Sequence, residues 1–141
     1  MKGESTTASP IRHPAVAGQF YPRDPDDLRA EVESYLSPLQ DAVPAVGCVV
    51  PHAGYIYSGH VAGAVYARLD VPQRSILMCP NHTGMGRPLS IMSEGAWPTP
   101  LGRVSSVSQL ASDLNRRFPP LGENPESTRA RKVSDVAWPF A

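Results

Sequence analysis

The sequence of 141 residues has few cysteines, little charge and no long apolar run. Two cysteines are too few for a disulfide scaffold, so we expect a reduced, cytoplasmic setting. The 13 basic and 13 acidic residues cancel, which argues against a nucleic-acid or membrane-surface protein, because such proteins carry a basic excess. No apolar run approaches the roughly 18 residues of a membrane span. The N-terminus has Lys2 but lacks the apolar stretch of a signal peptide.

Proline, by contrast, is abundant. The 16 prolines amount to about twice the usual share, and they lie mainly at the boundaries of predicted elements. They therefore separate folded elements and do not mark a disordered tract. Residues 1–10 are rich in serine, threonine and glycine and are predicted to form a disordered tail. The length by itself fits one domain.

The pattern along the chain predicts helices and strands in alternation. We expect helices over 25–38, 60–69 and 106–118, the first capped by Asp24 and the third by a Ser106–Gln109 capping box. Short apolar runs predict buried, parallel strands at 45–50 and 75–79 and a weak strand at 89–92. Residues 97–102 are expected to form a structured loop. The order strand, loop, helix, strand, loop indicates a βαβ unit and an α/β fold.

Two histidines follow the two main predicted strands. His52 lies two residues after Val50, and His82 lies three residues after Cys79. Parallel strands joined by a helical crossover end at the same edge of the sheet, where ligands bind. Neighbouring strands are roughly 5 Å apart, so both imidazoles are expected to reach one metal ion or one substrate.

Two imidazoles are an incomplete ligand set. Zinc sites use at least three protein ligands, and non-haem iron often uses two histidines and a carboxylate, so the pair does not choose among Zn, Fe and Cu. Each histidine alone is also explained as a hydrogen-bonded loop residue. His13 and His60 are weaker candidates than this pair. Cys48 and Cys79 are expected to be buried in strands as small apolar residues.

Four segments, in order along the chain, resemble the motifs of the Memo family, which is called AmmeMemoRadiSam system protein B in bacteria. The motifs are HPAVAGxFYP at residues 13–22, PHAGYxYSG at 51–59, PNHxG at 80–84 and WxTPLG at 97–102. The resemblance covers about residues 11–118. It implies a three-layer α/β/α fold with a mostly parallel sheet, like that of class III extradiol dioxygenases.

The resemblance also implies roles for single residues. His52 and His82 match two metal-binding positions, with Fe, Zn or Cu as the candidate metal. We assign five further residues to a candidate substrate pocket: His13, Tyr55, Tyr57, Asn81 and Trp97. For Tyr55, Tyr57 and Trp97, packing is the competing explanation. The family name implies a radical-SAM protein and an AMMECR-type protein as partners.

The sequence departs from the family pattern near its end. The register returns at 135–141, but Thr128, Arg131 and Lys132 occupy the region of the family's preceding His and Glu positions. Family members are roughly twice as long, so 11–141 is interpreted as the N-terminal half of the domain. We therefore expect an exposed edge strand and either marginal stability or self-association.

The leading hypothesis is an accessory module with a residual two-histidine site. A metal-dependent dioxygenase-like enzyme and a non-functional gene fragment are the alternatives.

Overall fold

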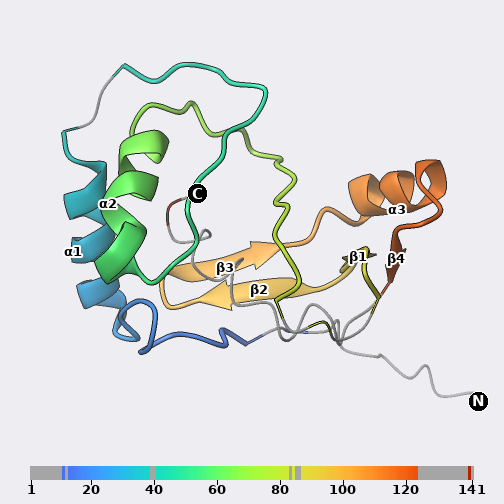
Figure 1. The fold of residues 1–141 in the computed structure, drawn as a ribbon, viewed down its shortest axis with the longest axis horizontal. Coiled ribbons are helices and arrows are strands. Elements are labelled where there is room, and N and C mark those ends of the chain that lie inside the picture. Colours follow the sequence, from blue (N-terminus) through green and yellow to red (C-terminus); the bar gives the residue numbers. More distant parts are fainter. Residues whose placement is uncertain are drawn as a thin grey trace, which may run out of the picture.

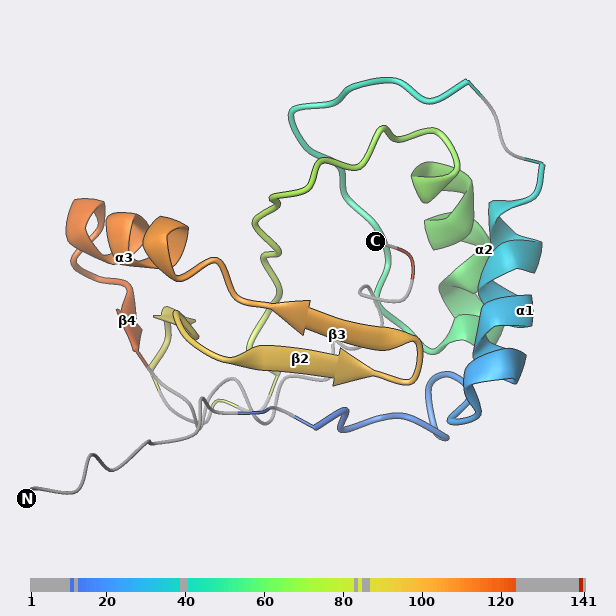
Figure 2. The same cartoon turned by 180° about the vertical axis from the view of Figure 1, so that it is seen from behind.

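The computed structural model describes residues 11, 13–38, 41–82, 84, 87–123 and 140. Two helices pack side by side at one end of the molecule, a third helix and a short parallel pair lie at the other, and a hairpin lies between them (Figures 1 and 2). The elements are α1 (Pro25–Leu36), α2 (Tyr55–Tyr66), β1 (Ser90–Ile91), β2 (Ala96–Thr99), β3 (Gly102–Ser105), α3 (Ser108–Arg117) and β4 (Gly122–Glu123). Among the described residues, β1 pairs with β4 in parallel and β2 with β3 antiparallel. The α/β class predicted from the sequence is confirmed.

Helix α1 begins as its sequence predicts. The Asp24 carboxylate accepts hydrogen bonds from the backbone N–H groups of Asp26 and Asp27, which otherwise lack partners at a helix start. Pro25 occupies the first turn, where its missing N–H costs nothing. Leu28 and Val32 are one turn apart and both are buried, so this face of α1 carries the contact with the core.

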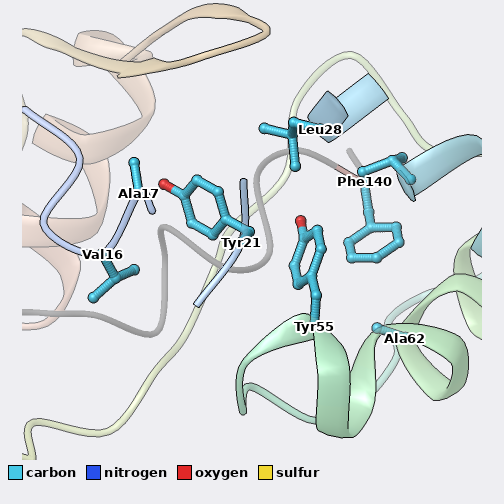
Figure 3. Packing of buried hydrophobic residues seen from close by; sticks show 8 residues of the cluster. Val16, Ala17, Tyr21, Leu28, Tyr55, Ala62 and Phe140 are labelled. Carbon is cyan, nitrogen blue, oxygen red and sulfur yellow. The ribbon is translucent and has the colours of Figure 1, made fainter. Parts of the chain in front are cut away.

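An aromatic cluster forms the centre of the core (Figure 3). Tyr55, at the start of α2, is 1% exposed, and its ring centroid lies 4.9 Å from that of Phe140 and 5.6 Å from that of Tyr21. Phe140 also stacks on Tyr66 at 5.5 Å. Burial raises the pKa of Tyr55, so this phenol stays neutral. A residue near the end of the chain thus joins the core made by residues 16–62.

Helices α1 and α2 approach closely through two glycines of α2. A Cβ atom added at Gly63 would lie 2.5 Å from the Cβ and the carbonyl oxygen of Tyr35, and one added at Gly59 would meet the Tyr35 ring. The Tyr35 hydroxyl donates to the Glu31 carboxylate at 2.8 Å, and its oxygen lies 3.3 Å from the Tyr55 carbonyl oxygen. Burial and then the Glu31 acceptor raise the Tyr35 pKa to about 12. Glycine is therefore needed at position 63, where backbone atoms of α1 occupy the space.

Helix α2 begins earlier than predicted. It starts at Tyr55, within the stretch 51–59 that the sequence indicated as a loop, and it ends at Tyr66. Gly54, which precedes the helix, has no side chain that could cap it, so no start signal marks Tyr55 in the sequence. The apolar pattern of 60–69 therefore indicated a later start. The loop that carries His52 is therefore short and runs directly into a helix.

The two main predicted strands do not form ladders in the described part of the chain. Residues 45–50 and 75–79 belong to no strand, and Val49 and Met78 are 94% and 88% exposed. Parallel strands depend on cover over both faces, which these side chains lack. Cys48 is exposed and Cys79 half-buried, so the prediction that both are buried is wrong. The three-layer arrangement remains a prediction.

The crossover between these segments nevertheless has the predicted direction. Both run the same way along the molecule, one before and one after α2 (Figures 1 and 2). A single parallel bridge joins them at their start, where the Val43 N–H donates to the Arg68 carbonyl and the Asp70 N–H donates to the Val43 carbonyl. The chain therefore has the path of a βαβ unit, although its two strand segments form no ladder among the described residues.

The second half of the described chain differs from the prediction in two places. The expected loop at 97–102 belongs to the β2–β3 hairpin, in which Trp97 pairs with Val104. Helix α3 forms, but the predicted capping box is wrong: Val107 precedes the helix, and the Gln109 side chain donates to Asp113. The predicted strand at 89–92 is confirmed in part, as β1.

Some predictions fall outside the described residues. These are the tail at 1–10, the basic stretch with Arg131 and Lys132, and most of the final segment 135–141. Within the described residues, no helix combines the length and apolar character that a membrane crossing requires.

Candidate metal site

His52 and His82 meet in the structure. Their Nε2 atoms lie 3.1 Å apart, and their ring centroids are separated by 5.3 Å. Both side chains are exposed. The two residues are 30 positions apart in the sequence, so the crossover through α2 brings them together. The predicted juxtaposition is present although the flanking segments are not paired as strands.

The loop of His52 is held from two sides. The hydroxyl of Ser58, which is 7% exposed, donates to the Ala53 carbonyl at 3.1 Å and ties the loop to the first turn of α2. The Tyr55 N–H donates to the Phe20 carbonyl at 2.7 Å. A Cβ atom at Gly54 would lie 3.3 Å from that same oxygen, so this backbone approach is tight. These contacts orient the chain next to His52.

The N-terminal motif supplies this support. Its turn is built on Gly18, which has a φ of +83° and whose N–H donates to the Tyr21 carbonyl. Arg23 donates to the Ala17 carbonyl at 3.2 Å, and Val16 is fully buried. The segment 13–22 therefore acts as a scaffold for the His52 loop.

The structure distributes the predicted pocket residues over several places. Tyr55 is buried in the core, whereas Tyr57, two residues later on α2, is 78% exposed. His13 is exposed, and Asn81, next to His82, is half-buried. Trp97 lies on β2. Of these residues, Tyr57 and Asn81 are close in sequence to the histidine pair, and Tyr55 is a core residue in this structure.

Trp97 lines an open apolar cavity of about 160 Å³. The cavity lies between the hairpin, α3 and the extended segment before His82, and its lining includes Ile76, Leu77, Val104 and Leu114. Among the described residues, no charged side chain lines it. The indole is thus half-buried against aliphatic residues, as packing predicts.

The geometry of the pair fits two ligands of one metal ion. Nitrogens bound to one ion at about 2.0–2.1 Å lie roughly 2.9–3.4 Å apart for octahedral to tetrahedral angles, and the observed 3.1 Å falls within that range. A hydrogen bond between one imidazole N–H and the other ring nitrogen has the same length. Among the described residues, no group of three or more His, Cys, Asp or Glu side chains is placed to hold a metal. Further ligands would have to come from elsewhere.

Sequence reasoning missed Ser58 and Gly54. Both lie inside the motif at 51–59, but neither has metal-binding chemistry, so a search for ligands passed over them. The detectable signal was the position of small residues between His52 and an apolar helix, which is where a tight loop-to-helix junction needs them.

Comparison with known proteins gives the same family as the motifs. The model of the Memo-like protein family matches residues 12–132. A MEMO1 family protein of Methanothermobacter thermautotrophicus is 42% identical over 144 residues, covering 92% of this chain and 51% of that protein. MEMO1 family proteins of Aquifex aeolicus and Methanosarcina barkeri are 44% and 46% identical, each over 74% of this chain and 39% of the relative. The chain spans about half the length, or less, of these curated relatives.

The family match extends over most of the described residues and includes both histidine loops, the supporting N-terminal motif and the hairpin. The chain therefore belongs to the Memo-like protein family.

Proposed function

We propose that this chain is a metal-binding module in which His52 and His82 hold one divalent transition metal, Fe, Zn or Cu. The observation that carries the proposal is the 3.1 Å approach of two exposed Nε2 atoms from separate loops. Imidazole nitrogen is a good ligand for all three metals. A metal bound there would supply Lewis-acid activation of an oxygen ligand. The remaining ligands would come from water, a partner chain or a substrate.

Metal binding tests this proposal directly. We expect the chain to bind one Zn²⁺ or Fe²⁺ per molecule, and His52→Ala and His82→Ala each to weaken binding by about 10–100-fold or more, since even outer-shell changes cost that much. His60→Ala is the matched control, because His60 is an exposed histidine of α2 outside the pair. Isothermal titration with metal analysis gives the stoichiometry. Stoichiometric binding that survives both alanine changes would rule out the two-histidine site.

For the biological role, we propose an accessory component of a radical-SAM-linked system in the cytoplasm. The support is family membership together with the resemblance described above, which implies a radical-SAM protein and an AMMECR-type protein as partners. Tagged chain co-expressed with both proteins should retain one of them through affinity and size-exclusion steps. Elution of all three as separate species at micromolar concentration would argue against this role.

A second candidate function is a metal-dependent oxidoreductase with a fold related to class III extradiol dioxygenases. The observation that favours it is the exposure of both imidazoles, because two ligands leave metal positions open to a substrate. In this reading His52 and His82 hold Fe²⁺ and a catechol-type oxygen approaches from solvent. With Fe²⁺, oxygen and a catechol supplied, we expect the absorbance of a ring-cleaved product to appear. The His82→Ala variant should not produce this absorbance. Stoichiometric binding of Fe²⁺ without turnover of the catechol would argue against the enzyme and in favour of the accessory role.

A further inference from the structure

Ser58 carries a buried hydroxyl in the first turn of an apolar helix. The hydroxyl donates to the Ala53 carbonyl at 3.1 Å. A serine within a helix ordinarily returns this bond to a helix carbonyl three or four residues earlier. Ala53 lies five residues earlier and precedes Gly54, the residue before the helix, whose own carbonyl accepts the Ser58 N–H. The hydroxyl therefore reaches out of α2 and into the loop that carries His52.

The helix itself gives no reason for a hydroxyl at this position. Alanine is the better helix former, and a buried hydroxyl costs free energy unless it has a partner. The buried residues that follow on α2, Gly59, Ala62 and Gly63, are all small and apolar. Alanine at position 58 would fit the same surroundings. The contact that alanine could not make is the hydrogen bond to Ala53, the residue next to His52.

The chain after His52 is held on both sides of Gly54. On one side, Ser58 binds the Ala53 carbonyl. On the other side, the Tyr55 N–H donates to the Phe20 carbonyl at 2.7 Å, and the Tyr55 ring points into the aromatic cluster (Figure 3). His52 is bonded directly to Ala53, so its side chain starts from a backbone whose direction is fixed.

A fixed backbone matters for a pair of exposed side chains. His52 and His82 come from separate loops, and their Nε2 atoms lie 3.1 Å apart. Ligands of a metal must be held within about 0.5 Å of the productive geometry by the residues around them. A pair that is already in place binds more tightly, because less freedom is lost when the metal binds.

We propose that Ser58 is a positioning residue for the histidine pair. Its hydrogen bond to Ala53 keeps His52 next to His82 before a metal binds. The inference rests on the proposed two-histidine site, to which it adds a residue that touches neither the metal nor an imidazole. Its effect on the pair is therefore separable from metal binding.

Two measurements on Ser58→Ala in the full 141-residue chain test the proposal. The first is the nuclear Overhauser contact between the ring protons of His52 and His82 in the metal-free chain, which we expect in the original protein and not in the variant. The second is Zn²⁺ affinity by isothermal titration, which we expect to fall by about tenfold, the lower end of the cost of losing a supporting contact. Circular dichroism checks that the variant is folded.

Ser34→Ala is the matched control. The Ser34 hydroxyl donates to the Glu31 carbonyl at 2.7 Å, so the same kind of bond is lost on an exposed part of α1. This variant should change neither the Overhauser contact nor the Zn²⁺ affinity. Ser58→Thr keeps a hydroxyl at the position and should retain the contact and most of the affinity.

Several results would overturn the role of Ser58. One is a folded Ser58→Ala chain that keeps the Overhauser contact and the original Zn²⁺ affinity. A second is an unfolded Ser58→Ala chain, which would assign the residue to the fold and not to the pair. A third is equal loss in Ser58→Ala and Ser58→Thr, which would assign the effect to packing. If the original chain shows the contact but binds no Zn²⁺, and Ser58→Ala loses the contact, the metal site fails and the positioning role stands.

Discussion

Tyr55→Ala is expected to lower the free energy of unfolding by about 3–5 kcal/mol, the usual cost of removing a buried aromatic side chain. Tyr55 is 1% exposed and contacts Tyr21 and Phe140. It connects α2, the N-terminal scaffold and a residue near the end of the chain in one cluster (Figure 3). Small domains have only about 5–15 kcal/mol of stability, so this loss removes a large part of it. Urea denaturation followed by circular dichroism measures it.

Tyr57→Ala is the matched control for this change. Tyr57 is in the same helix, two residues further on, but it is 78% exposed. An exposed substitution of this kind is expected to stay within about 0.5 kcal/mol of the original protein. Equal losses for the two variants would show that the cluster does not carry the stability of the described fold, and that the exposure of the two tyrosines does not govern their roles.

Gly63→Ala is expected to destabilise the protein by about 2 kcal/mol, although alanine is the better helix former. The change removes the helix penalty of glycine, which favours the variant by about 1 kcal/mol. It also places a Cβ atom 2.5 Å from the Cβ and carbonyl oxygen of Tyr35. Overpacking costs typically about 1–3 kcal/mol, and here the obstacle includes backbone of α1, which yields only if the helices separate. The upper part of that range applies.

The same denaturation measurement tests the glycine prediction. Gly47→Ala is the control, because a Cβ atom at Gly47 meets nothing within 4 Å. We expect that control to change the free energy of unfolding by no more than about 0.5 kcal/mol. A Gly63→Ala protein as stable as the original, or more stable, would mean that α1 and α2 are not in close contact in solution.

The elements that followed from sequence are those set by local chemistry. The start of α1 is one example: Asp24 and Pro25 satisfy or avoid the unpaired N–H groups at the helix start, and the structure confirms both. The pairing of His52 with His82 is another, because it depends on the direction of a crossover and not on details of packing. The family also followed from sequence, since its motifs are contiguous and ordered.

The misplaced elements depend on contacts distant in the sequence. The apolar runs at 45–50 and 75–79 have strand character, but a strand ladder needs neighbours and cover that the described chain does not provide. The hairpin at 96–105 was hidden because Pro98 and Pro100 indicated a loop. Helix α3 formed without the capping box, since its apolar face and not its cap selects it.

The sequence by itself determined the family, the α/β class and the identity of the two candidate ligands. These depend on the order of residues and on the handedness of a crossover, both of which are properties of the chain. Only the tertiary structure decided that Tyr55 is a core residue while Tyr57 faces solvent, that Gly63 lies against the α1 backbone, and that Val49 and Met78 are exposed. Burial depends on which surfaces meet, and apolar character alone does not specify the partner of a surface.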